Sequence, residues 1–201
     1  MLEAADLECA RGGRILFRGL SFALKEGELL RIAGANGRGK TSLLRILCGL
    51  LSPTAGEVRW KGEPIGALHE EYSKQLVYLG HAPAVKDELT AAENLSIACR
   101  LAGNVRDPAE IPAALRTLAV PEAVLVKTLS QGQRRRAALA RLAMSQAVPL
   151  WLLDEPLAAL DAQAARLVEG LIAEHIGQGG SVVYTTHQEA RLEGRVISLD
   201  G

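Results

Sequence analysis

The chain has 201 residues, of which 48% are hydrophobic, and its 23 basic side chains are balanced by 23 acidic ones. This length and apolar content suit one globular domain with its own core, and they exclude the disordered, collagen-like and disulfide-stapled classes. A nucleic-acid-binding domain usually carries a basic excess, which the balanced charge does not provide. We therefore expect a single domain over residues 1–201 and no nucleic-acid partner.

The cysteines and the N-terminus indicate where the chain works. Cys9, Cys48 and Cys99 are far apart and lack the CxxC or Cys/His spacing of a metal site, so we expect buried thiols in a reducing cytosol. Residues 1–6 are acidic and lack the basic and apolar segments of a signal peptide. No run reaches the roughly 18 to 20 apolar residues that cross a bilayer. We expect the chain to stay in the cytoplasm and to reach a membrane only through a partner.

The first third of the chain alternates short strand-like runs with turns. Alternating apolar and polar residues between glycine-containing turns predict an antiparallel layer at the edge of the fold. A compact apolar run over residues 29–33 then leads into a glycine loop, and leucines at helical spacing follow over residues 40–50. Residues 29–50 therefore follow the order strand, glycine loop and helix. The antiparallel layer described first consists of the runs at residues 4–9, 20–24 and 57–60.

Two later strands indicate that the main sheet is parallel. The apolar runs over residues 150–153 and 181–185 have the length of buried strands, and polar sequence with helical character follows each of them. Buried strands that alternate with helices are typical of a mostly parallel α/β sheet.

The segment between the two halves of this sheet is helical in pattern. It predicts a helical sub-domain over about residues 86–145, inserted into a sheet-forming core over about residues 1–85 and 146–201. The helices are predicted at residues 90–101, 111–118 and 131–144.

The glycine loop carries the phosphate-binding pattern of a glycine, four residues and then Gly-Lys-Thr, between a strand and a helix as this motif requires. Glycines allow backbone N–H groups to turn toward a phosphate, and the helix start adds its positive dipole end. We expect Lys40 to hold the β- and γ-phosphates of ATP and Thr41 to bind Mg²⁺. The alternative, a glycine-rich turn with a solvated lysine, is disfavoured by the flanking strand and helix. The expected nucleotide-binding residues here are Gly34, Ala35, Asn36, Gly37, Arg38, Gly39, Lys40, Thr41 and Ser42.

Two carboxylates and a histidine follow the later strands, at the edge where ligands gather in open α/β sheets. We expect Asp154 to bind Mg²⁺, largely through water, and Glu155 to polarise the water that attacks the γ-phosphate. His187 follows the strand at residues 181–185 and is expected to sense the γ-phosphate as a hydrogen-bond donor. An acidic turn and a structural histidine are the alternatives, which the phosphate loop upstream disfavours.

The string Leu-Ser-Gln-Gly-Gln at residues 129–133 resembles the LSGGQ signature of ABC ATPases, with glutamine in place of the middle glycine. Ser130 should cap the following helix, so that its hydroxyl group and the free N–H groups face a phosphate. The turn at residues 158–161 resembles the D-loop of the same family. The resemblance implies a phosphate-loop NTPase core with an antiparallel layer, ATP hydrolysis, and a head-to-tail homodimer. In that dimer the ATP of one subunit would contact Ser130, Gln131, Gly132, Gln133 and Asp161 of the other.

Two positions depart from the pattern of the ABC family. His81 stands where most members have a glutamine that contacts Mg²⁺ and the lytic water, and an imidazole can still make one hydrogen bond there. We therefore expect a catalytic and metal-contacting role for His81, with an ordinary surface histidine as the alternative. Arg11 lies where an aromatic residue commonly stacks on adenine, and its planar guanidinium group could take that place.

The segments at residues 78–81, 89–95 and 185–188, together with the short length, resemble the ABC ATPases that serve cytochrome c maturation. The resemblance implies a peripheral subunit on the cytoplasmic face of the bacterial inner membrane, with two copies joined to membrane-embedded transporter subunits. ATP turnover would then drive haem export or release a haem-loaded chaperone. The chain has no CxxCH motif, and neither His69 nor His175 has a second ligand at useful spacing, so we expect no direct haem binding.

Three other functions share part of this pattern. They are an ABC ATPase for another transported substrate, a soluble ABC ATPase outside transport, and a phosphate-loop nucleotide kinase, which the signature string disfavours. The arginines at residues 134–136 are expected to form a solvated helix face, with nucleic-acid binding as the alternative. The loop at residues 82–89, beside His81, is the expected coupling surface for a membrane partner, because it joins the core to the helical insert.

Overall fold

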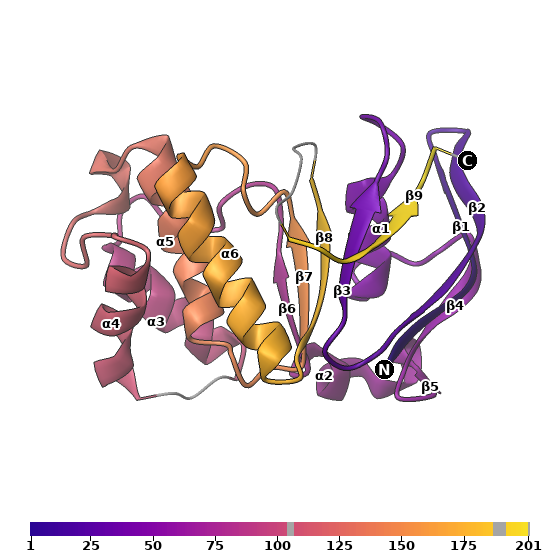
Figure 1. Cartoon of the computed structure of the whole chain (residues 1–201), viewed down its shortest axis with the longest axis horizontal. Helices are drawn as coiled ribbons and strands as arrows, with labels where there is room; N and C mark the ends of the chain where they lie inside the picture. The colour runs from indigo at the N-terminus through magenta and orange to yellow at the C-terminus, as the bar shows by residue number, and fades with distance from the viewer. Residues whose placement is uncertain (104–106, 187–191, 201) are drawn as a thin grey trace.

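The computed structural model describes residues 1–103, 107–186 and 192–200. Two sheets lie side by side, with most helices gathered on one flank of the larger sheet and the smaller sheet on the other flank (Figure 1). The larger sheet has the strand order β6-β7-β8-β3-β9, and the smaller has the order β2-β1-β4-β5. This is the predicted combination of a parallel sheet, an antiparallel layer and a set of helices.

All strand pairs in the larger sheet are parallel. Its central strands are buried along their whole length, which explains why they appear in the sequence as continuous apolar runs. The edge strand β9 was not predicted. It is short and mostly exposed, so it has no apolar run to mark it. The strands are β3 (Leu29–Ala33), β6 (Leu76–Leu79), β7 (Leu150–Asp154), β8 (Ser181–Thr185) and β9 (Arg195–Ser198).

The smaller sheet is antiparallel, and its two long strands extend beyond the predicted runs. Register shifts interrupt the pairing of the first two strands between Ala4 and Ala10. Gly56 packs against this irregular stretch, where an added Cβ would lie 2.4 Å from the carbonyl oxygens of Ala5 and Asp6. A side chain at that position would therefore push the strands apart. The strands are β1 (Leu2–Arg11), β2 (Arg14–Leu24), β4 (Ala55–Trp60) and β5 (Glu63–Pro64).

Three of the helices begin at polar side-chain caps that the sequence makes visible. Thr90 and Ser130 each form a reciprocal capping box with the residue three positions later, and Asp161 caps a third helix through its carboxylate. No helix in the described part of the chain has both the length and the hydropathy of a membrane-spanning segment. The helices are α1 (Lys40–Leu47), α2 (Ile65–Ser73), α3 (Ala91–Leu101), η1 (Pro108–Glu110), α4 (Ile111–Thr117), η2 (Val126–Thr128), α5 (Gln131–Ala143) and α6 (Ala162–Gly177).

Alternate residues of the parallel sheet face two separate cores. Trp151 and Leu153 point into the core beneath α3 to α6, whereas Leu150 and Leu152 point into the core between α1 and the antiparallel sheet. The parallel sheet is therefore covered on both faces, as such sheets require. Two of the three cysteines are buried as expected, but Cys48 is only half-buried.

His175 is a buried histidine at the end of α6. Its ring stacks on Trp151 with the centroids 3.9 Å apart and the planes at 4°. Its Nδ1 atom lies 3.2 Å from the carbonyl oxygen of Gln146. Gly180 lies against the ring so closely that an added Cβ would be 2.2 Å from it. This histidine therefore packs as part of the core.

Acid should destabilise the protein through His175. Burial lowers the pKa of this side chain below its ordinary value, so the native state favours the neutral ring. The unfolded chain then binds more protons once the pH falls below about 6.5, and the free energy of unfolding should decrease from there toward the native pKa. Replacing His175 by phenylalanine keeps a stacked ring without a titrating group. Urea unfolding between pH 7.5 and 5 should show a smaller loss of stability in this variant.

The exposed His69 provides the control for this measurement. His69→Gln should keep the pH dependence of the parent protein. An unchanged acid slope in His175→Phe would show that the destabilisation comes from other groups.

Candidate functional site: a cleft at the edge of the parallel sheet

A cleft of about 440 Å³ opens at the carboxyl edge of the parallel sheet. It brings together the phosphate loop, the two carboxylates, His81 and the turn at residues 158–159, which are far apart in the sequence. Ligands of open α/β sheets bind at this edge. The lining residues are Leu16, Asn36, Gly37, Gly39, Lys40, Thr41, Ser42, His81, Asp154, Glu155, Ala158 and Ala159.

Glycines shape the loop between β3 and α1. Gly37 and Gly39 have positive φ angles of 80° and 97°, a conformation that favours glycine. Gly39 caps α1, and an added Cβ would lie 3.0 Å from the Cβ of Leu16 and 3.2 Å from the ring of Phe17. The loop therefore rests directly on β2, and the first residues of α1, whose N–H groups have no partner within the helix, line the cleft as an anion site requires.

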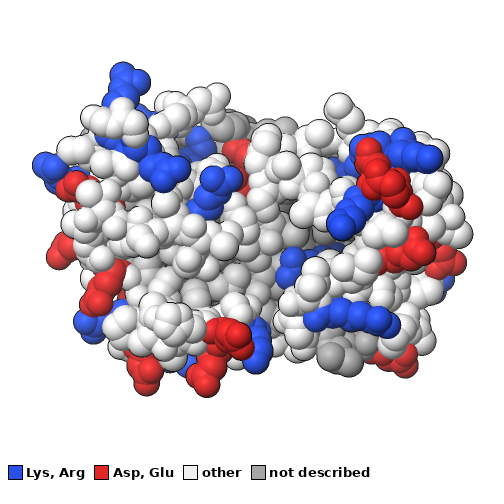
Figure 2. Space-filling model, turned by 180° about the vertical axis from the view of Figure 1, so that it is seen from behind, with Lys and Arg blue, Asp and Glu red and all other residues white. Residues whose placement is uncertain are grey.

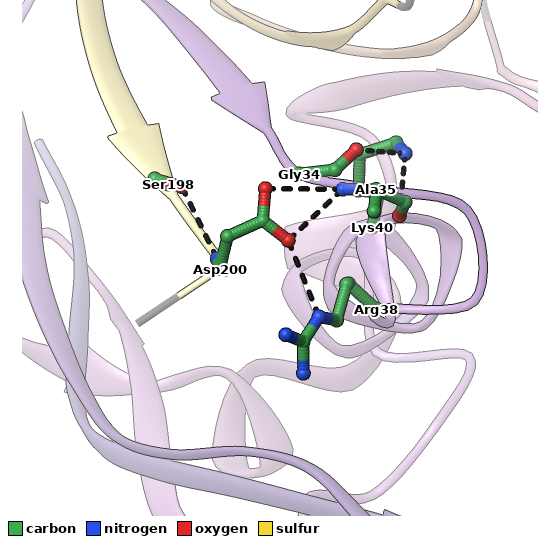
Figure 3. A network of polar contacts seen from close by, with 6 residues as sticks. All are labelled: Gly34, Ala35, Arg38, Lys40, Ser198 and Asp200. Atoms are coloured by element: carbon green, nitrogen blue, oxygen red, sulfur yellow. Dashed lines mark hydrogen bonds and ion pairs between the residues drawn. The ribbon is translucent and has the colours of Figure 1, made fainter.

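Lys40 is buried and folds back over its own loop. Its Nζ donates to the carbonyl oxygens of Gly34 at 2.6 Å and Ala35 at 3.2 Å. From the other side, the N–H of Ala35 donates to the carboxylate of Asp200 at 3.0 Å and 3.1 Å (Figure 3). The Gly34–Ala35 peptide is thus held at its oxygen by an ammonium group and at its N–H by a carboxylate.

Asp200 was not predicted as a site residue. It follows β9, 165 residues away from the loop in sequence, and it also accepts a hydrogen bond from Arg38 Nε at 3.2 Å (Figure 3). The hydroxyl of Ser198 accepts from its N–H at 3.1 Å. No local motif surrounds this aspartate, so only the pairing of β9 with β3 reveals the contact.

Asp154 is buried at the end of β7, where two threonines orient its carboxylate. Thr41 Oγ1 donates to one oxygen at 2.8 Å, and Thr185 Oγ1 donates to the other at 2.7 Å. Thr185 also accepts a hydrogen bond from the N–H of Glu155 at 3.0 Å. Thr185 therefore fixes both the carboxylate of Asp154 and the backbone that follows it. The sequence marked Thr185 only as the end of a strand, because its role depends on its register opposite Asp154.

Glu155 leaves the strand with an unusual backbone. Its φ of 52° lies in the left-handed region, which costs a residue other than glycine about 1 to 2 kcal/mol. Such conformations often occur at functional positions, where the surrounding contacts maintain them. Here the turn lets Asp154 and Glu155 line the same cleft, although consecutive residues of a regular strand point to opposite faces.

Of the three other residues expected at the site, one lines the cleft, one does not, and one is not described by the structure. His81 is exposed and lines the cleft beside Thr41 and the carboxylates. Arg11 is exposed at the end of β1, opposite Arg14, and is not among the cleft residues, whereas Leu16 is. His187 lies outside the described residues.

Comparison with known proteins decides the family. The family model described as ABC transporter matches residues 17–158, which include the phosphate loop, the signature string and both carboxylates. The chain belongs to the ABC transporter family. Among curated relatives, it is similar to two proteins named cytochrome c biogenesis ATP-binding export protein CcmA. The one from Nitrosospira multiformis is 50% identical over 98% of this chain and 96% of its own. The one from Aromatoleum aromaticum is 53% identical over 94% of this chain and 90% of its own.

Among solved structures, the chain is similar to a bacterial ABC transporter cassette described as dimeric. The TM-score is 0.85 at 25% identity, over 98% of this chain and 94% of that one. The predicted ABC nucleotide-binding fold is therefore confirmed. The residue limits of the helical sub-domain stay a prediction.

The ABC signature string lies outside the cleft of its own chain. Ser130 Oγ accepts from the N–H of Gln133 at 3.2 Å, and the side chain of Gln133 accepts from the N–H of Ser130 at 2.9 Å. An added Cβ on Gly132 would lie 3.5 Å from the carbonyl oxygen of Ala159, so the string adjoins the turn that resembles the D-loop. Asp161, which ends this turn, accepts from the N–H of Ala164 at 2.7 Å. Both ABC motifs thus share one surface beside the cleft.

The expectation of a solvated face for residues 134–136 is wrong for the middle arginine. Arg134 pairs with Asp87 at 2.9 Å, and Arg136 donates to the carbonyl oxygen of Leu118 at 3.2 Å. Arg135 is only 5% exposed and points into the protein. Consecutive helical residues are about 100° apart around the axis, so three in a row do not share one face.

Proposed function

We propose that this chain hydrolyses ATP to ADP and phosphate as the nucleotide-binding subunit of an ABC transporter for export in cytochrome c biogenesis. The observation that carries the proposal is the hydrogen bond of 2.8 Å between Thr41 and Asp154, in one cleft with Lys40 and Glu155. The printed names of the similar proteins support the biological setting.

Phosphate binding would use groups that already point into the loop. Lys40 would exchange the carbonyl oxygens of Gly34 and Ala35 for β- and γ-phosphate oxygens. The N–H groups of residues 37–42 would bind the same phosphates at the start of α1. An adenine contact for Arg11 remains a prediction, and Leu16 offers an apolar surface at the same cleft.

The oxygen donors in the cleft fit Mg²⁺, which prefers hard oxygen ligands. Thr41 and Asp154 would hold the ion, and His81, which lines the same cleft, would be a third contact. The bound ion would supply positive charge against the phosphate oxygens.

Hydrolysis would depend on Glu155. Water adds to the γ-phosphorus, the bond to the bridging oxygen breaks, and ADP and phosphate leave. Glu155 would orient this water and accept its proton, and Thr185 and the turn at Glu155 keep the carboxylate at the cleft. His187 is proposed as the γ-phosphate sensor.

A second copy of the chain would complete each site. Ser130, Gln131, Gly132, Gln133 and Asp161 lie outside the cleft of their own chain, although the family uses the matching motifs to bind nucleotide. We therefore infer a head-to-tail homodimer in which they contact the ATP held by the partner.

The membrane-embedded subunit would dock on a groove of about 760 Å³ at the edge of β6. Figure 2 shows that this side of the molecule is hollowed, between the half that contains the antiparallel sheet and the half that contains the helices α3 to α5. Leu101, Leu50 and Ile97 line the groove with exposed fractions of 84%, 69% and 42%, which are high for large apolar side chains. Ala84, Lys86 and Leu89 connect it to the loop beside His81. The chain would thus work as a peripheral subunit on the cytoplasmic face of the bacterial inner membrane, driving haem export or release of a haem-loaded chaperone.

Affinity capture from native membranes tests this proposal. The parent protein should retain integral membrane proteins of the cytochrome c maturation system, identified by mass spectrometry. Leu101→Asp should lose them, because a carboxylate would be buried against an apolar partner surface. Val124→Asp, at an exposed apolar residue outside the groove, is the matched control. Capture of transporter subunits for another substrate, or equal capture by both variants, would contradict the proposed role or the proposed groove.

A further inference from the structure

Arg135 connects the signature helix α5 to both loops that carry catalytic side chains. Its Nη1 donates to the carbonyl oxygens of Gly80 at 3.1 Å and His81 at 2.7 Å. Its Nη2 donates to those of Asp154 at 3.0 Å and Glu155 at 2.7 Å. One buried guanidinium group therefore holds the backbone of the loop after β6 and of the loop after β7.

The chemistry of arginine suits this position. The planar guanidinium group presents donors in a fixed fork, so each terminal nitrogen can bridge two consecutive carbonyl groups. Hydrogen bonds from a charged donor are shorter and stronger than those between neutral groups. Burial lowers the pKa of Arg135, and the carboxylates of Asp154 and Glu155 oppose this shift. The buried charge is thus compensated by carbonyl dipoles and by the carboxylates that it helps to place.

The two neighbouring arginines do not make this connection. Arg134 contacts Asp87 and the carbonyl oxygens of Leu129 and Lys127, all within the predicted helical sub-domain. Arg136 reaches the carbonyl oxygen of Leu118 in the same part of the chain. Among these three arginines, Arg135 is the one that crosses to the parallel sheet.

We propose that Arg135 is a positioning residue that transmits the position of α5 to His81 and Glu155. This rests on the proposed function, in which the start of α5 contacts the nucleotide of the second copy. Ser130 and Arg135 lie on one helix and its cap, so a shift of the signature string on closure must move the guanidinium group as well. That movement reaches the carbonyl groups of the residues that face the attacking water. Each chain's α5 touches the nucleotide of the other copy through Ser130 and the catalytic loops of its own chain through Arg135. Hydrolysis in a chain's own site therefore depends on whether nucleotide is bound in the other copy.

Arg135→Gln and Arg135→Lys test the proposal in the full chain. Neither side chain can bridge four carbonyl groups, so the catalytic loops lose their common support. A misplacement of about 1 Å costs roughly 10²-fold in rate, and we expect kcat to fall by about 10- to 100-fold. The dissociation constant of a fluorescent ATP analogue should change less than about threefold, because the phosphate loop is untouched. The Hill coefficient for ATP should fall toward one, with lysine less affected than glutamine because it keeps the charge.

Arg136→Gln is the matched control, since it removes one arginine of the same helix that bonds a single carbonyl group. It should keep the kcat and Hill coefficient of the parent protein. A parallel loss of kcat, analogue affinity and melting temperature in both Arg135 variants would identify a purely structural residue and overturn the proposal. Unchanged kinetics, or failure of both variants to fold, would also overturn it. Absence of ATP hydrolysis by the parent protein would instead overturn the proposed function.

Discussion

Replacing Glu155 by glutamine is expected to leave ATP bound while stopping its hydrolysis. Glutamine has nearly the shape of glutamate but cannot accept the proton of the attacking water, and loss of a general base costs about 10²- to 10⁴-fold in rate. The backbone at this position should stay in place. Its N–H is held by Thr185 and its carbonyl by Arg135, two contacts that the substitution does not touch.

Two measurements should agree on this result. Steady-state phosphate release should fall by at least about 10², and ATP should hold two copies of the variant together during size-exclusion chromatography. Glu122→Gln, at an exposed glutamate, should behave as the parent protein does. Ordinary turnover by Glu155→Gln would remove Glu155 from the mechanism.

Replacing Lys40 by alanine is expected to abolish hydrolysis and to weaken ATP binding. Charge-assisted hydrogen bonds contribute about 1.5 to 3 kcal/mol, so the affinity for ATP should fall by about 10- to 100-fold. The substitution also leaves the carbonyl groups of Gly34 and Ala35 without the donor that they have now. The loop that binds the phosphates should therefore lose part of its shape as well as its charge.

Titration with a fluorescent ATP analogue and a phosphate-release assay check this expectation. Lys127→Ala removes an exposed lysine away from the cleft and should leave both readings unchanged. Full ATPase activity in Lys40→Ala would show that the loop does not bind the reacting phosphates.

Much of the fold could be predicted because its strongest signals are local. The buried strands β7 and β8 are continuous apolar runs, and the phosphate loop marks the passage from β3 to α1. Elements with weak local patterns were missed. β9 is mostly exposed, and α2 contains the non-helical residue His69, with a φ of 41°, inside a short segment.

The residues of the candidate site likewise fall into those that a local motif predicts and those that only the fold brings to the site. The phosphate loop and the carboxylates Asp154 and Glu155 belong to short motifs, so each could be found without knowledge of the fold. Thr185, Arg135 and Asp200 act through strand register, helix face and strand pairing, which no short string encodes. The sequence therefore predicts the groups proposed to touch the nucleotide better than the groups that hold them in place.

The contact between Asp200 and the phosphate loop affects how the protein should be prepared. Any segment that follows Asp200, a fused purification tag included, would start next to the carboxylate that binds Ala35 and Arg38 (Figure 3). A displacement of β9 from its pairing with β3 would break the hydrogen bonds of Asp200 to Ala35 and Arg38, and the phosphate loop would lose this support. Figure 1 shows the amino terminus at the opposite edge of the strands from the loop between β3 and α1, so a tag placed there should leave the affinity for nucleotide unchanged.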